Sequence, residues 1–101
     1  MYEKEASIDK RLKLYLDHHF KDGKWTKTTT NDGSVWFGFV KNDGRMIVGK
    51  PLSSDDNNYF YDGSYFVSNI ELLLGITLKE FREGMIRYLD TKYGLNITSI
   101  F

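Results

Sequence analysis

Cysteine is absent from the 101 residues of the chain, and proline occurs only once. Without cysteine the protein cannot form a disulfide, use a thiolate nucleophile or hold a metal through sulfur. No apolar run approaches the about 18 residues that a membrane-spanning helix requires. The opening segment, MYEKEASIDK, is too charged for a signal peptide. We therefore expect a cytoplasmic protein that does not associate with a membrane.

An excess of charge of one sign is also absent, because 14 Lys and Arg residues balance 14 Asp and Glu residues. No overall attraction to nucleic acid or to a membrane surface follows from this balance. The chain is rich in aromatic residues, with seven Phe, seven Tyr and two Trp. Together with the aliphatic residues these can fill one core, so we expect a single domain over residues 1–101. The abundance of Lys, Asn, Ile, Tyr and Phe suggests an AT-rich genome and favours a bacteriophage or mobile element as the source.

Motifs of catalysis and metal binding are missing as well. The sequence holds no phosphate-binding glycine loop, no nucleophile elbow and no zinc-protease motif. The two histidines, His18 and His19, are adjacent, so on a helix they point about 100° apart and cannot chelate one metal ion. A calcium loop built around Gly63 fails because its third position is Phe60, which has no ligand oxygen. We expect no catalytic residue, no metal, no cofactor and no enzymatic activity.

An amphipathic helix is predicted near the start of the chain, from about residue 3 or 7 to Lys21. Apolar residues between Ile8 and Phe20 recur at helical spacing and form one stripe. Gly23 is expected to end this helix, because glycine adopts the left-handed conformation without strain. In this interpretation His19 borders the core and His18 faces solvent.

A second helix is predicted from Thr77 to Gly94. Thr77 and Glu80 have the spacing of a capping box, in which each side chain accepts a hydrogen bond from the backbone of the other residue. Gly94 marks the end of the helix. Glu83 and Arg87 lie four residues apart within it, which predicts a surface ion pair.

An antiparallel meander is predicted between the helices. Three runs rich in β-branched and aromatic residues form it: Lys24–Thr30, Ser34–Lys41 and Arg45–Lys50. Asn-Asp-Gly separates each neighbouring pair. Asp-Gly between two such runs is the strongest short-range hairpin signal, because a two-residue loop needs positive φ at both positions.

Two-residue loops would fix which side chains share a face of the sheet. They pair Trp25 with Val40 in the first hairpin, and Val40 with Ile47 and Gly38 with Gly49 in the second. The predicted core face carries Val35, Phe37, Phe39, Met46 and Val48. The opposite face carries Trp25, Lys27, Trp36, Val40, Ile47 and the two glycines. A slip of one residue in the register would exchange these faces.

Downstream of the meander the predicted elements are shorter. A polar loop over residues 53–58 precedes two short strands, Tyr59–Tyr61 and Ser64–Val67, and a helical turn that ends at Gly75. Alternation from Leu95 onward predicts a last strand. The whole is an α+β domain with an N-terminal helix, an antiparallel meander of three to five strands, a C-terminal helix and a short final edge strand, with the helices on one face of the sheet.

The facing glycines, Gly38 and Gly49, would leave a trough on the face opposite the core. Trp25 or Trp36 could fill this trough by lying across it. If the trough stays open, the flanking aromatic and basic residues have the composition of a protein-binding hot spot. The predicted partner-binding residues are Trp25, Lys27, Trp36, Arg45, Tyr59, Tyr61 and Tyr65.

These residues lead to the hypothesis of a small non-enzymatic binding protein that docks onto a host or partner protein and modulates or inhibits it. The alternative is a nucleic-acid-binding accessory or regulatory domain, in which the same rings stack on bases and the same cations neutralise phosphates. Both hypotheses are compatible with a monomer and with a homodimer formed through an open sheet edge or the aromatic face.

Overall fold

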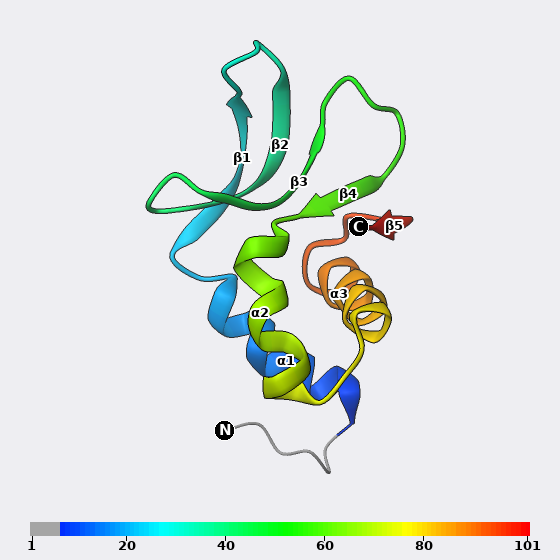
Figure 1. Cartoon of the computed structure of the whole chain (residues 1–101). Helices are drawn as coiled ribbons and strands as arrows, with labels where there is room; N and C mark the ends of the chain where they lie inside the picture. Colours follow the sequence, from blue (N-terminus) through cyan, green and yellow to red (C-terminus); the bar gives the residue numbers. More distant parts are fainter. Residues whose placement is uncertain (1–6) are drawn as a thin grey trace.

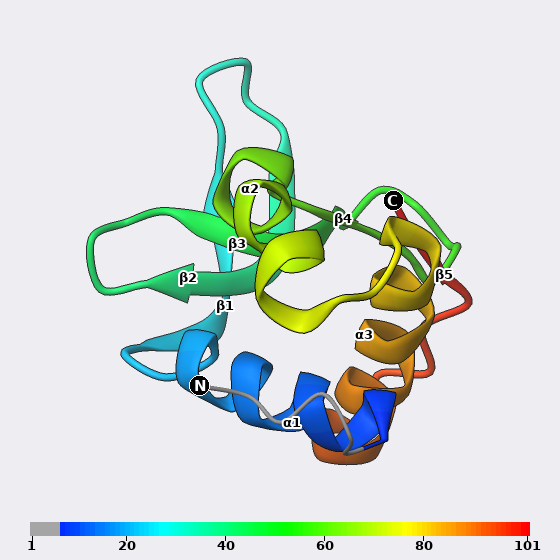
Figure 2. The same cartoon turned by 60° about the horizontal axis from the view of Figure 1, so that its bottom comes forward.

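Three helices and a five-stranded sheet make up residues 7–101, the part of the chain that the computed structural model describes, with the side chains of residues 67–69 left aside. The predicted α+β architecture is confirmed: an N-terminal helix, a four-stranded antiparallel meander, a C-terminal helix that packs on the N-terminal one, and a final short parallel edge strand (Figure 1, Figure 2). The elements in chain order are α1 (Ile8–His19), β1 (Gly23–Thr29), β2 (Val35–Lys41), β3 (Met46–Pro51), β4 (Asn58–Tyr61), α2 (Gly63–Leu74), α3 (Leu78–Tyr93) and β5 (Ser99–Ile100).

Local capping signals set the ends of α3 as the sequence predicts. The Thr77 hydroxyl accepts from the Glu80 N–H at 3.1 Å, and the Glu80 carboxylate accepts from the Thr77 N–H at 2.8 Å. Gly94 ends the helix with a φ of 64°. The two reciprocal bonds satisfy backbone donors that the first turn of a helix leaves free.

The end of α1 differs from the prediction. The helix stops at His19 with Phe20 as its C-cap, and the residue with left-handed backbone is Asp22, whose φ is 58°. Gly23 is already the first residue of β1, so the expectation that it ends the helix was wrong. Aspartate is among the few residues that tolerate this conformation, because its short polar side chain bonds locally.

The first hairpin has a three-residue loop rather than a two-residue one. Thr30 N–H donates to the Ser34 carbonyl at 2.8 Å, and Gly33 takes the left-handed position with a φ of 87°. The Asp32 carboxylate stabilises this loop by accepting from the Ser34 N–H and the Thr30 hydroxyl. The register is therefore shifted by one residue, and Trp25 lies opposite Phe39 instead of Val40.

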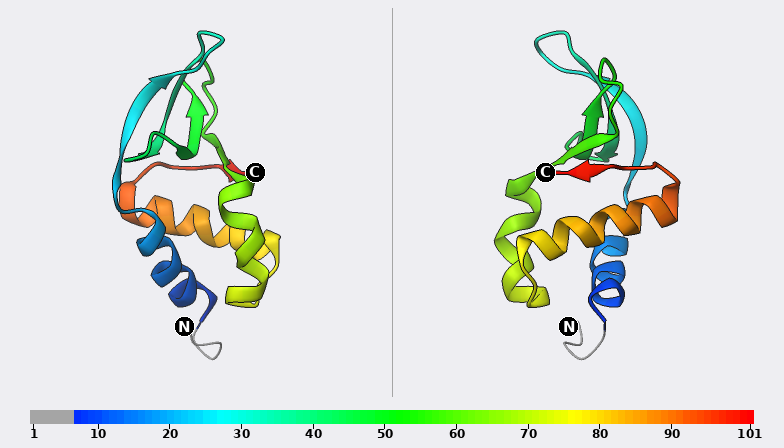
Figure 3. Two further views of the ribbon diagram at one scale, coloured as in Figure 1. Left: turned by 60° about the vertical axis from the view of Figure 1, so that its left-hand side comes forward. Right: turned by 90° about the vertical axis from the view of Figure 1, so that its right-hand side faces the viewer.

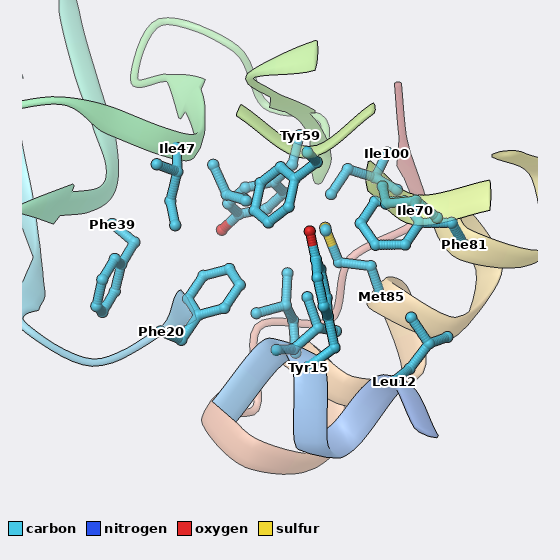
Figure 4. Packing of buried hydrophobic residues seen from close by; sticks show 14 of the residues in the cluster. Leu12, Tyr15, Phe20, Phe39, Ile47, Tyr59, Ile70, Phe81, Met85 and Ile100 are labelled. Atoms are coloured by element: carbon cyan, nitrogen blue, oxygen red, sulfur yellow. The ribbon is translucent and has the colours of Figure 1, made fainter. Parts of the chain in front are cut away.

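The second hairpin follows the predicted register only beyond a β-bulge. Gly38 pairs with Gly49 and Phe39 pairs with Val48, as expected, but Val40 pairs with Met46 rather than with Ile47. The bulge leaves Ile47 as the extra residue, so that Ile47 and its neighbour Val48 are both fully buried (Figure 4).

The bulge and the first loop also change the composition of the core face. Of the five residues predicted to form it, Phe39 and Val48 are buried and Phe37 is half-buried. Val35 is 41% exposed, and Met46 lies on the opposite face.

The segment after β4 is helical where a strand was predicted. Strand β4 confirms the prediction for Tyr59–Tyr61, but Ser64–Val67 belongs to α2. The Asp62 carboxylate caps this helix by accepting from the Ser64 and Tyr65 N–H groups at 3.0 and 3.3 Å. A good N-cap thus outweighs the β propensity of the aromatic residues that follow it.

All three helices lie on one side of the sheet (Figure 1, Figure 3). The strand order is β1-β2-β3-β4-β5, with β5 running parallel to β4 at one edge and β1 at the other. The core fills the space between the sheet and the helices (Figure 4). Its buried members are Leu12, Tyr15, Leu16, Phe20, Phe39, Ile47, Val48, Tyr59, Phe66, Ile70, Leu74, Ile76, Phe81, Met85, Leu89, Ile97 and Ile100. Within residues 7–101 no helix has the length and apolarity needed to cross a membrane.

Candidate protein-binding surface

The two tryptophans do not share a face, which corrects the predicted aromatic surface. Because the first loop has one residue more than expected, Trp25 points to the helix side of the sheet and Trp36 to the other side. The Trp25 ring packs against the rings of Phe37 and Phe39, with centroids 5.6 and 5.8 Å away. Trp25 is therefore a partly buried member of the core periphery.

Two of the predicted tyrosines also belong to the core. Tyr59 is only 3% exposed, and burial raises the pKa of its phenol. The Tyr61 ring lies 5.9 Å from that of Phe66 and 5.8 Å from that of Phe81. Both tyrosines point inward from β4. Burial removes Tyr59 from any docking surface, whereas half-buried Tyr61 also lines a shallow hollow beside Met46.

Arg45 and Tyr65 lie together at the start of α2. The Arg45 guanidinium donates to the Asp62 carboxylate at 2.7 Å and to the Ser64 hydroxyl at 2.6 Å, and lies 5.2 Å from the centre of the Tyr65 ring. These bonds to Arg45 and Ser64 lower the pKa of Asp62 to about 2. The contacts attach the second hairpin to α2 and give Arg45 a structural role.

Tyr65 in turn contacts α1. Its hydroxyl and His19 Nδ1 share a hydrogen bond of 2.9 Å. Burial of His19, with the positive charge of His18 and Lys41 nearby, lowers the pKa of His19 to about 4. His19 therefore stays neutral at the edge of the core, whereas His18 is exposed.

The predicted basic residues are dispersed. Lys27 is exposed, and its place in the register puts it on the same side of the sheet as Trp25. Lys41 donates to the backbone carbonyls of His19 and Lys21 at 3.0 and 2.6 Å. Within residues 7–101, Lys27 thus lies on the other side of the sheet from Trp36, and Arg45 is bonded to Asp62 and Ser64 at the start of α2.

The side of the sheet that faces away from the helices carries a different aromatic cluster. The rings of Trp36 and Phe60 have centroids 5.6 Å apart, and those of Phe60 and Phe101 are 4.6 Å apart. Phe60 is 39% exposed and Phe101 is 56% exposed. We call these three rings together with Met46 the outer patch.

Met46 fills the trough between the paired glycines. A Cβ atom placed on Gly38 would lie 2.8 Å from the Met46 sulfur, and one placed on Gly49 would lie 2.5 Å from it. The trough is therefore neither open nor covered by a tryptophan, because a flexible thioether lies across it. A shallow hollow of about 190 Å³ remains beside Met46, lined also by Trp36 and Phe60.

Phe60, Phe101 and Met46 were not predicted as functional residues. For Phe60 the signal was present in the alternation of β4, since strand neighbours point to opposite faces. Once Tyr59 and Tyr61 point inward, Phe60 must point outward. The position of Met46 depends on the bulge, which the sequence does not mark.

A larger hollow of about 500 Å³ lies between α1 and α3. The Arg87 Nε–H is shared between both Asp9 carboxylate oxygens at 3.1 Å, and Nη2 donates to one of them at 2.6 Å. The predicted pair of Arg87 with Glu83 is therefore replaced by an interhelical one. Asp17 accepts from Lys13, Tyr88 and Lys92, and the first two of these bonds lower the pKa of Asp17 to about 2. The charged side chains that line this hollow, Asp9, Asp17, Lys13, Arg87 and Lys92, bond to one another across it, with one positive charge in excess.

Comparison with known proteins does not assign a function to this surface. The chain matches no protein-family model, no curated protein and no solved structure. Among the described residues, no three His, Cys, Asp or Glu side chains are grouped as metal ligands would be. The outer patch is thus the surface whose exposure and composition point most directly to a function.

Proposed function

We propose that this chain is a small non-enzymatic binding protein that docks onto a partner protein through the outer patch and modulates or inhibits that partner. The observation that supports this proposal is the row of rings formed by Trp36, Phe60 and Phe101 on the side of the sheet away from the helices. Large rings that are partly exposed in a row are enriched in protein-binding hot spots. A cytoplasmic location and a phage or mobile-element source, suggested by composition, belong to the same proposal.

The chemistry of the outer patch favours a partner surface that is apolar and uncharged. None of its four side chains carries a charge, and Met46 gives it a side chain that can adapt its shape. Among the basic side chains that could neutralise phosphates, Arg45 and Lys41 are engaged elsewhere and Lys27 lies on the other side of the sheet, which leaves Lys24 of β1 on the side of the outer patch. The nucleic-acid alternative therefore has less support, and it becomes an outcome of the test.

The test compares baits that differ only in the outer patch. Wild type, Phe60→Ser and Leu72→Ser are immobilised and exposed to lysate of a candidate host, and a retained protein is then purified and titrated. Leu72 is the matched control, because it is 87% exposed but lies on α2. We expect Leu72→Ser to bind like wild type and Phe60→Ser to bind about 30-fold more weakly, the loss typical of a hot-spot residue.

The variants must keep the fold for this comparison to count, which circular dichroism and thermal unfolding will establish. Retention of the same protein by folded Phe60→Ser and folded Trp36→Ala would contradict the proposal. Binding of a labelled oligonucleotide that falls steeply as salt is raised would instead support the nucleic-acid alternative.

A further inference from the structure

Strand β1 leaves a row of backbone groups unpaired at the edge of the sheet (Figure 3). Hydrogen bonds at both ends of this strand show which of its residues direct their backbone groups toward β2. Asn42 N–H donates to the Asp22 carbonyl and Thr30 N–H donates to the Ser34 carbonyl, both at 2.8 Å. Hydrogen-bonded pairs alternate along an antiparallel ladder, so the even-numbered residues between 22 and 30 face β2.

The odd-numbered residues therefore direct their N–H and C=O groups away from the sheet. These are Gly23, Trp25, Lys27 and Thr29. In the described part of the chain no other strand pairs with them, and the only local contact is the Thr26 hydroxyl, 3.5 Å from the Lys27 carbonyl. An edge of this length is a template for one more strand.

Two exposed lysines, Lys24 and Lys27, lie in β1, and a third, Lys21, lies in the turn that leads into the strand. None of their ammonium groups bonds to another residue between 7 and 101, whereas Lys41 and Lys50, for example, donate to nearby oxygens. Side chains alternate along a strand, so Lys24 lies on the outer side of the sheet and Lys27 on the helix side. Cations thus flank the free edge on both sides, and β1 itself contains no acidic residue.

We propose that the β1 edge binds an extended, acidic segment of a partner protein, which adds to the sheet as a sixth strand. The backbone groups of the odd-numbered residues supply main-chain hydrogen bonds. The lysines select Asp and Glu side chains on either side of the added strand. The proposal stands independently of the outer patch, because the two surfaces share no residue.

Two other occupants fit this edge less well. A second copy of β1 paired antiparallel would bring the lysines of both copies close together, and like charges across a strand pair are destabilising. A nucleic acid offers phosphate acceptors but no row of donors for the free carbonyls. It also needs rings to stack on, and the Trp25 ring beside the lysines is packed against Phe37 and Phe39.

The experiment follows backbone amide exchange in the full ¹⁵N-labelled chain. The probes are two end-blocked octapeptides in which two valines alternate with two charged residues, glutamate in one peptide and lysine in the other, so that charges lie on both sides of the added strand. With the glutamate peptide we expect exchange at the amides of Trp25, Lys27 and Thr29 to slow about tenfold or more, while the amides of Thr26 and Thr28 stay unchanged. The lysine peptide should have no effect.

Variants separate backbone pairing from charge. Lys27→Pro removes an edge donor as well as the charge, without removing a bond to β2, so it should weaken the glutamate peptide about tenfold more than Lys27→Gln, which removes the charge alone. The double change Lys24→Glu and Lys27→Glu should transfer binding to the lysine peptide. The double change Lys10→Glu and Lys79→Glu, at exposed lysines of α1 and α3, is the charge-matched control and should leave binding unchanged.

Several results would overturn the proposal. One is unchanged exchange at Trp25 and Lys27 with millimolar glutamate peptide, and another is equal binding of both peptides. If raising the concentration of the protein alone slows exchange at the same amides, the occupant of the edge is a second copy of the chain. Salt-sensitive binding of an oligonucleotide that loses affinity in the double glutamate variant would identify a nucleic acid. Phe60→Ser should leave peptide binding intact, so failure at this edge is distinguishable from failure of the outer patch.

Discussion

The Asp62 carboxylate makes two interactions, and mutation can separate their contributions to the free energy of unfolding. One oxygen caps α2 by accepting from the Ser64 and Tyr65 N–H groups, and the other accepts from Arg45 at 2.7 Å. Loss of an N-cap side chain costs about 1 kcal/mol. The Arg45 pair is exposed to solvent, so it should contribute much less than the cap.

We therefore expect Asp62→Ala to lower the free energy of unfolding by about 1 kcal/mol, which is about 4–8 °C in Tm for a domain of this size. Asp62→Asn keeps a capping oxygen and Arg45→Met keeps the cap, so both should stay close to wild type. Asp55→Ala is the control, because Asp55 is an exposed loop residue whose carboxylate bonds to no other described residue. Urea denaturation at pH 7 measures all four variants.

The pH dependence of the Asp62 effect gives a second check. The pKa of Asp62 is lowered from 3.8 to about 2 in the folded protein, so its contribution is complete above pH 3.8 and is lost as the pH falls toward 2. The part of the difference between wild type and Asp62→Ala that depends on the carboxylate charge should shrink across that window, whereas the part that depends on a capping oxygen should remain, because protonation leaves that oxygen in place. If Arg45→Met destabilises as much as Asp62→Ala, the assignment of the energy to the cap is wrong.

Two further predictions concern His19 and Gly38. The pKa of His19 is lowered from 6.5 to about 4, so between these pH values the unfolded chain binds more protons than the folded one. The free energy of unfolding should therefore fall by about 1–2 kcal/mol from pH 6.5 to 4, allowing for solvent screening. In urea titrations His19→Gln should make the free energy of unfolding less dependent on pH in this range. Gly38→Ala should destabilise by about 1–3 kcal/mol because its Cβ would overlap the Val48 carbonyl oxygen as well as the Met46 sulfur. Met46→Ala should therefore fail to rescue it in thermal unfolding, and a full rescue would show that only the sulfur is in the way.

The parts of the fold that local chemistry decides were predictable from sequence. Thr77 with Glu80 predicted the start of α3 and Gly94 predicted its end, because caps act within one turn of the chain. Gly75 ends α2 as predicted, with a φ of 67°. The strands around Phe39 were predictable for the same reason, since β-branched and aromatic runs bounded by Asp-Gly have few alternatives.

The predictions that failed depended on a one-residue difference in loop length, or on whether a sequence pattern starts a helix or a strand. Asn-Asp-Gly is compatible with a two-residue and with a three-residue loop, and the choice is made by bonds to Asp32 that pattern alone does not weigh. At Asp62-Gly63 the same dipeptide that turns a hairpin elsewhere starts a helix instead. Each of these choices moved side chains that had been assigned to a binding surface.

The register of the first hairpin determines which residues form both proposed binding surfaces. With a three-residue loop, Trp25 contributes its ring to the core and its backbone to the free edge, while Trp36 is left on the outer side beside Phe60. The edge then offers hydrogen bonds and positive charge, and the outer patch offers apolar area without charge. A single partner that used both would need an acidic strand followed by an apolar surface that reaches around β1 and β2. The Lys27→Pro and Phe60→Ser variants distinguish this from two separate partners, because with one partner each change should weaken the same complex and the losses in free energy should add.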